Sequence, residues 1–216
     1  MAVAFSHSSG AGNASGGTTS FSWTHNATGD NYLTVGLAFR PNVSNISVTF
    51  NGVAMTLLGS RTTGGDGLEF CYVYGLANPS SGSYTVSVSW TTTSRAAGVA
   101  LSFTGTNITA GNVATNASSG TNDLTITNSP GPGASDLLVA YGAVDENASF
   151  LSVTNGTQRV IQGQADGNYI SLASATDTDS TVTFHSSTTS IGWTGVSVVL
   201  TEVTAAKNPA FLLNFV

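Results

Sequence analysis

The sequence predicts an all-β protein, an antiparallel and jelly-roll-like β-sandwich built from two pseudo-repeats. Three observations predict this class. Apolar and polar residues alternate in many short segments, Asn-Gly turns lie between two pairs of these segments, and the first half of the chain can be aligned with the second. No window has the apolar spacing and the caps of a helix. The chain is therefore expected to consist of strands and turns.

The clearest element is a β-hairpin centred on Asn51-Gly52. Apolar residues alternate with polar ones in residues 46–50, and the alternation resumes in residues 53–58. Asn-Gly suits a type I′ turn because both of its central positions have a positive φ. The same dipeptide recurs at Asn155-Gly156 between two further alternating segments, so a second hairpin is expected there.

The other elements follow from the same alternation, and clusters of Gly, Ser, Asn and Asp between them indicate turns. The first series of expected strands spans residues 3–8, 19–24, 32–39, 46–50, 53–58, 68–75, 84–90 and 98–104. The second series spans residues 124–127, 136–144, 150–154, 158–162, 169–175, 181–185 and 192–200.

The two series align with each other, which indicates an internal duplication. Gly36 aligns with Gly142, Asn51-Gly52 with Asn155-Gly156, and Gly98 with Gly195. We expect one sandwich over residues 1–206 whose halves, about 1–107 and 108–206, pack directly on each other. The alternative is two tandem immunoglobulin-sized sandwiches joined near residues 106–110. The short connection favours direct packing.

The composition excludes several classes of partner. Only 7% of the residues are charged, and the formal net charge is −6. The few basic residues are scattered, whereas a phosphate-binding surface needs clustered cations, so nucleic acid is not an expected partner. No segment approaches the ~20 apolar residues of a membrane span, and the N-terminus lacks the features of a signal peptide. We therefore expect a soluble protein made in a host cytoplasm, with no membrane partner.

The reactive residue types do not form a catalytic or metal-binding motif. The single cysteine, Cys71, lies in an apolar segment and is expected to be buried. The three histidines lack the spacing of zinc ligands. The core is expected to hold Trp23, Trp90 and Trp193. We therefore expect no enzyme and no cofactor.

Two acidic pairs leave a minor alternative. Asp145-Glu146, and Asp177 with Asp179, offer carboxylates for Ca²⁺ or, less favoured, for glycoside cleavage.

The C-terminus stands apart from the alternating segments. Pro209 should end the preceding strand, and an apolar segment of residues 210–216 follows it. This segment is either a final edge strand of the sandwich or an arm, spanning residues 207–216, that docks on a neighbouring subunit. Because exposed apolar side chains are costly in water, the expected interface residues are Phe211, Leu212, Leu213, Phe215 and Val216.

Four motifs lie at residues 32–36, 48–56, 82–88 and 97–105. Together they resemble a loosely defined group of Gly/Ser/Thr-rich β-sandwich proteins encoded among the structural genes of tailed bacteriophages and in bacterial surface proteins. The resemblance implies a virion protein, most simply a capsid decoration protein, that forms a homo-oligomer and binds the major capsid protein or a tail protein. It brings no catalytic residue.

The alternative functions are a phage tail or fibre protein and a secreted bacterial surface module. A module of either kind would bind a host glycan through loop residues such as Tyr72, Tyr74 or Tyr169.

Overall fold

The computed structural model describes residues 1–13, 17–62, 69–145, 151–163, 170–186 and 191–203. These residues form strands and turns, which confirms the predicted all-β class. Among them, no helix is long and apolar enough to cross a membrane. The strands of the first half are β1 (Ala4–Gly12), β2 (Thr18–Asn26), β3 (Tyr32–Arg40), β4 (Ser47–Phe50), β5 (Val53–Ala54), β6 (Thr56–Arg61), β7 (Phe70–Ala77) and β8 (Ser83–Thr104).

The strands of the second half repeat this series. They are β9 (Ile108–Thr121), β10 (Asp123–Thr127), β11 (Leu137–Asp145), β12 (Leu151–Thr154), β13 (Thr157–Gly163), β14 (Ile170–Asp177), β15 (Thr181–Ser186) and β16 (Ile191–Glu202).

The strand pairing also repeats, which shows the duplication directly. In the second half β9 pairs with β16, β10 and β12 pair with β15, β11 lies between β14 and β16, and β13 pairs with β14. In the first half β1 takes the place of β9, β2 of β10, β3 of β11, β4 of β12, β6 of β13 and β7 of β14. First-with-last and second-with-next-to-last pairing of this kind is jelly-roll-like. Every described strand pair joins strands of the same half.

Strand β8 is the main difference between the halves. It is 22 residues long, its first part pairs with β2 and β4, and its last part pairs with β1 and β3. In the second half these pairings are divided between two separate strands: β15 pairs with β10 and β12, and β16 pairs with β9 and β11. The prediction of two strands at residues 84–90 and 98–104 was wrong here, because the polar residues between them continue the strand as it passes from one sheet to the other.

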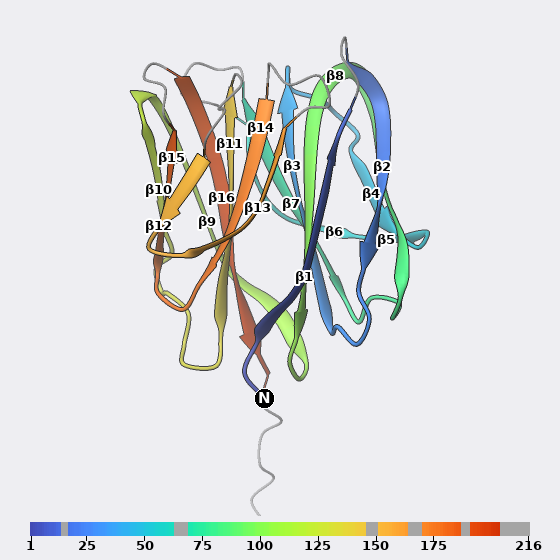
Figure 1. Ribbon diagram of the computed structural model, residues 1–216, viewed down its shortest axis with the longest axis vertical. Helices are drawn as coiled ribbons and strands as arrows, with labels where there is room; N and C mark the ends of the chain where they lie inside the picture. The colour runs from blue at the N-terminus through green and yellow to red at the C-terminus, as the bar shows by residue number, and fades with distance from the viewer. Residues whose placement is uncertain (14–16, 63–68, 146–150, 164–169, 187–190, 204–216) are drawn as a thin grey trace, which may run out of the picture.

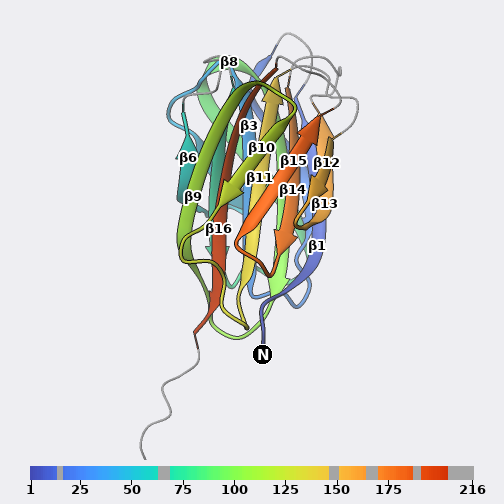
Figure 2. The ribbon, with the colours of Figure 1, turned by 90° about the vertical axis from the view of Figure 1, so that its left-hand side faces the viewer.

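The four sheets form a stack of layers (Figures 1 and 2). Each half has an inner five-stranded sheet and a smaller outer sheet, and in the first half β8 joins the two into one eight-stranded sheet. The two inner sheets face each other. One apolar core fills each half, and a third core, which we call the shared core, lies between the inner sheets. Each half therefore encloses a core of its own, and the two halves pack directly on each other.

Strand β3 shows why the inner sheets are buried on both faces. Its residues alternate between the shared core, which contains Tyr32 and Ala38, and the core of the first half, which contains Leu33 and Leu37. A strand with apolar neighbours on both sides has a continuous apolar sequence rather than a strict alternation. The eight residues from Tyr32 to Phe39 are accordingly all buried.

A close contact between the halves lies at Gly36. An ideal Cβ on Gly36 would lie 2.2 Å from Cδ1 of Tyr141. Gly142, in contrast, faces Phe184 inside its own half. The alignment of Gly36 with Gly142 is therefore wrong by one residue, and Gly36 occupies the position equivalent to Tyr141. Single-residue errors of this kind reverse the face to which a strand residue points.

Two further predictions need correction. Strand β9 was missed because its sequence is rich in Thr, Ser, Asn and Ala, and much of it lies at the edge of the inner sheet. Asn51 and Gly52 both have a positive φ, as a type I′ turn requires, whereas only Asn155 does so in the second turn. The chain at Asn155-Gly156 passes from outer strand β12 to inner strand β13 and does not form a hairpin, although the two turns occupy equivalent junctions.

The predicted core residues are confirmed. Trp23, Trp90 and Trp193 are buried. Cys71 is fully buried, and burial raises the pKa of its thiol to about 12, so the thiol stays protonated and unreactive near neutral pH.

Candidate interaction surfaces

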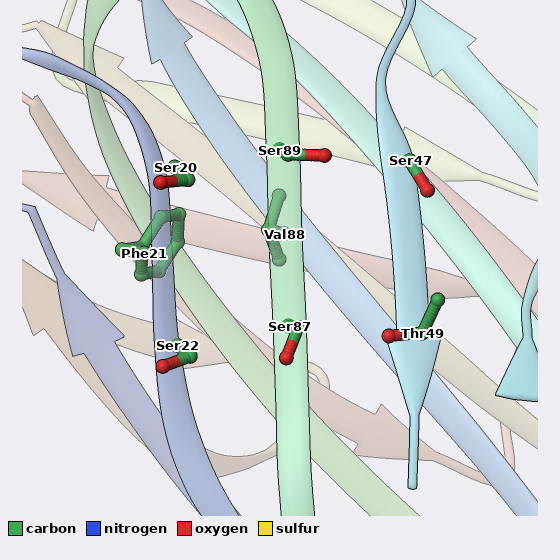
Figure 3. A pocket seen from close by; sticks show the side chains of 8 residues that line it. All are labelled: Ser20, Phe21, Ser22, Ser47, Thr49, Ser87, Val88 and Ser89. Carbon is green, nitrogen blue, oxygen red and sulfur yellow. The ribbon is translucent and has the colours of Figure 1, made fainter. Parts of the chain in front are cut away.

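The outer sheet of the first half carries two rows of hydroxyl groups (Figure 3). Cross-strand pairing aligns Ser20, Ser89 and Ser47 in one row, and Ser22, Ser87 and Thr49 in the other. Five of these six side chains are exposed, and Thr49 is half-buried. Two residues along a strand span about 6.7 Å and neighbouring strands lie about 4.8 Å apart. The hydroxyl groups therefore form a small regular lattice.

A shallow groove of about 340 Å³ runs over this lattice. Phe21 and Val88, which are paired across β2 and β8 between the two rows, pack into the core of the first half beneath the groove. Hydroxyl groups both donate and accept hydrogen bonds and carry no charge. The groove is therefore suited to a neutral polyhydroxylated ligand or to an ordered layer of water.

The outer sheet of the second half presents a related set of polar pairs. Thr125 Oγ1 lies 2.9 Å from Thr183 Oγ1, and Thr127 Oγ1 lies 3.1 Å from Thr181 Oγ1. Both threonine pairs are cross-strand neighbours on β10 and β15.

A histidine links all three strands of this outer sheet, β10, β15 and β12. His185 Nδ1 lies 2.6 Å from Asp123 Oδ1, and its Nε2 lies 2.7 Å from Thr154 Oγ1. Carboxylate, imidazole and hydroxyl follow the order of a hydrolase relay. The Asp123 side chain is 56% exposed, however, and the Thr154 side chain is exposed as well. Water competes for groups placed on such an open face, and we interpret the arrangement as a cross-strand bridge.

A buried polar cluster lies where β1 of the inner sheet adjoins β2 of the outer sheet. Asp30, whose side chain is fully buried, accepts a hydrogen bond from Ser102 Oγ, and its Oδ2 lies 2.9 Å from His7 Nδ1. Nearby, Trp23 Nε1 donates to Ser9 Oγ, which lies 2.8 Å from His25 Nδ1. Among the described residues, His25 Nε2 and Asp30 Oδ1 have no hydrogen-bond partner. Buried groups of this kind usually hold a water molecule.

The cluster makes stability depend on pH. Burial lowers the pKa of His25 from 6.5 to about 4, against the opposing charge of Asp30. Between pH 6.5 and about pH 4, His25 binds a proton in the unfolded chain but not in the folded chain, so stability falls as the pH falls through this range. Below about pH 4 His25 is protonated in both states and causes no further loss. At about 1.4 kcal/mol per pKa unit, the loss is about 3 kcal/mol.

Urea unfolding between pH 7 and pH 4 measures this loss. The control is His25→Gln, which removes the titrating group but leaves Asp30 and His7 in place. The loss of stability between pH 6.5 and pH 4 should be smaller in this variant by about 3 kcal/mol. Equal pH dependence in the two proteins would show that His25 is not the group responsible.

An apolar hollow of about 280 Å³ lies between the halves, beside the start of β9. Tyr32 and Leu76 contribute from the first half, and Ile108 and Ala110 from the second. Leu58, a half-buried residue of β6, lines its side. The hollow opens at the edge of the seam where β6 faces β9.

The first and last described residues, Met1 and Val203, lie at the same end of the stack, which we call the terminal pole (Figure 1). The N-terminal amino group of Met1 forms an ion pair with Glu202. The backbone N–H of Val203 donates to the carbonyl of Asn107 at 3.1 Å. Val203, the last described residue, therefore lies beside the start of β9.

The structure places the predicted site residues as follows. Phe211, Leu212, Leu213, Phe215 and Val216 lie outside the described residues, as does Tyr169. Tyr72 and Tyr74 are not loop residues, because both lie in β7 and are buried. Tyr72 donates to Asn42 Oδ1 at 2.6 Å. Burial raises the pKa of both phenols, and neither is placed to contact a glycan.

The structure describes the side chains of only one of the two acidic pairs, Asp177 with Asp179. Glu146 and the side chain of Asp145 lie outside the described part. Within the described residues, no group of three or more His, Cys, Asp or Glu side chains is arranged to hold a metal ion.

Sequence reasoning missed both the hydroxyl lattice and the polar cluster. The alternation of Ser and Thr in residues 85–91 was a signal for an exposed hydroxyl row, whereas no sequence signal brings His7, His25 and Asp30 together.

No protein-family model, curated protein or solved structure matches this chain. Proposals on function therefore rest on the residues and the geometry described above.

Proposed function

We propose that this protein is a non-enzymatic structural component of a virion, most simply a capsid decoration protein on a phage particle. The observation that carries the proposal is the terminal pole. The chain leaves the β stack there and continues into the apolar residues of segment 204–216. A subunit attached through this pole holds the rest of the stack away from the particle. Its partners are the major capsid protein or a tail protein, and further copies of itself.

The construction of the stack supports the proposal. Three apolar cores lie between four sheets, and the outer faces carry neutral hydroxyl groups. With only 7% charged residues, electrostatic interactions are a small part of the stability. A fold of this kind keeps its shape over a wide range of salt concentration, which suits a subunit exposed on a particle.

Quantitative mass spectrometry of purified particles tests the proposal. A decoration protein should be present in hundreds of copies per particle, whereas a tail or fibre protein should be present in a handful. Absence from purified particles would contradict a virion role of either kind.

Removal of residues 210–216 is expected to abolish attachment to particles that lack the protein. Burying a Phe or Leu side chain contributes about 1.5–3 kcal/mol, so four such residues can dominate binding. The circular dichroism spectrum of the truncated protein should stay close to that of the full chain, because the described strands end before this segment. Full retention of particle binding would place the attachment surface elsewhere.

The hydroxyl-lined groove favours a second candidate function, the binding of a neutral glycan by a tail, fibre or surface module. The six hydroxyl groups supply the hydrogen-bond donors and acceptors that a sugar ring needs. Binding to a glycan array should then be lost in Ser89→Leu, which fills the groove. It should persist in the matched control Thr127→Leu on the other outer sheet. Equal binding by the two variants would exclude the groove.

A further inference from the structure

Two seams run along the sides of the interface between the inner sheets. Strand β1 faces β13 along one seam, and β6 faces β9 along the other. Because the halves are duplicates, the seams are equivalent: β1 corresponds to β9, and β13 corresponds to β6. A residue that fills one seam therefore has a counterpart in the other.

Strand register identifies the counterparts. Phe5 pairs with Phe103, which pairs with Tyr32, and Ala110 pairs with Leu200, which pairs with Leu137. Tyr32 and Leu137 are equivalent, so Ala110 is the counterpart of Phe5.

The opposite strands of the seams correspond in the same way. A register shift lies between Leu57 and Gly59 in β6, and another lies between Gln158 and Val160 in β13. Leu58 is the extra residue in the shift of β6, and Arg159 is the extra residue in the shift of β13. These two residues are therefore counterparts.

In the first seam the chain fills the position itself. The ring of Phe5 packs edge-on against Phe103, with 6.4 Å between centroids. The guanidinium of Arg159 covers the Phe5 ring at 4.1 Å and donates from Nε to Thr176 Oγ1 at 2.7 Å. The aromatic ring and its cationic cover close this seam.

In the second seam Ala110 stands where the first seam has the Phe5 ring, and Leu58 stands where it has the Arg159 guanidinium. Ala110 has no ring, and Leu58 has no cation. The apolar hollow of about 280 Å³ lies at this position. The second seam therefore has room for an aromatic side chain where the first seam holds Phe5.

Val203, the last described residue, lies next to this hollow. Val203 bonds to Asn107, and Ile108 and Ala110 line the hollow. Seven residues, 204–210, separate Val203 from Phe211, the next aromatic residue in the sequence. Seven residues can span up to about 25 Å when extended. A tether this short gives an effective concentration in the millimolar range. Binding within one chain is therefore favoured over binding to a second copy.

We propose that the hollow beside Ala110 binds the Phe211 side chain of the same chain, which takes the place that Phe5 has in the other seam. The docked segment keeps its apolar residues out of water until a partner displaces it. The proposal goes beyond the proposed function, because docking within the chain requires no particle.

A disulfide beside this contact tests the docking and leaves Phe211 in place. Full-length protein with Thr109→Cys and Ala210→Cys should form an intramolecular disulfide under mild oxidation, at a rate that does not depend on protein concentration, because Thr109 also lines the hollow. A disulfide needs Cα atoms within about 7 Å, and the native Cys71 is buried and does not compete. The control pair is Thr115→Cys with Ala210→Cys, since Thr115 is exposed on the same strand outside the hollow. Disulfide-linked dimers alone, or no disulfide above the control, would overturn the proposal.

Ala110→Phe provides an independent test. This variant fills the hollow with its own ring, as Phe5 fills the first seam. It should release the segment and raise the rate of tryptic cleavage after Lys207 at least several-fold. Thr115→Phe should leave the rate unchanged. An unchanged rate in Ala110→Phe, with a native circular dichroism spectrum, would contradict the proposal. Neither test measures attachment to particles. A negative result in either test therefore contradicts docking within the chain and does not contradict the proposed function.

Discussion

Replacing Gly36 with alanine is expected to lower the free energy of unfolding by more than about 3 kcal/mol, at the upper end of the cost of overpacking a core. The new Cβ would lie 2.2 Å from Cδ1 and 2.5 Å from Cε1 of Tyr141. Tyr141 cannot move aside easily, because it is fully buried in the shared core and its hydroxyl lies 2.7 Å from Thr34 Oγ1. The two inner sheets would have to separate to make room. Urea denaturation at pH 7 measures the loss.

A second substitution separates this contact from general effects of losing a glycine. Gly156→Ala is the control, since its new Cβ would meet its nearest neighbour at 3.3 Å and its φ is not positive. It should change stability by less than about 1 kcal/mol. In a background of Tyr141→Leu, Gly36→Ala should cost clearly less than in the native protein, as coupled neighbours show. An equal cost in both backgrounds would mean that Tyr141 is not the obstacle.

The first half, residues 1–106, is expected not to remain a folded and soluble monomer when it is produced alone. Separation from the second half exposes the shared-core face of its inner sheet, which includes Val73, Val99, Leu101 and Phe103. At about 1.5–3 kcal/mol per buried side chain, losing the burial of four such residues costs about 6–12 kcal/mol. That cost is comparable to the whole stability of a typical domain, about 5–15 kcal/mol.

Size-exclusion chromatography and binding of an apolar dye measure the outcome. Co-production with residues 107–216 is the control, and it should restore a soluble complex of the two halves that binds little dye. A monomeric first half that unfolds cooperatively on its own would show that the halves are independent sandwiches, as the tandem arrangement requires.

The sequence by itself determined the class of fold and its duplication. Period-two alternation depends only on neighbouring residues, so it locates strands such as β4 and β10 from local information. The type I′ turn at Asn51-Gly52 is equally local, because a positive φ at both residues is a property of those two residues. The burial of the three tryptophans followed from the strand faces on which they lie.

Only the tertiary structure decided how the halves meet and which polar groups come together. Residues of β3 face two different cores, and a continuous apolar sequence does not say which neighbour covers each face. The contact of Gly36 with Tyr141 joins residues 105 positions apart, and the hollow at Ala110 exists only because two edges, β6 and β9, lie opposite each other. The polar cluster likewise joins β1, β2 and β8 with Asp30 through long-range pairing. Such contacts depend on the packing of whole sheets, which local sequence patterns do not encode.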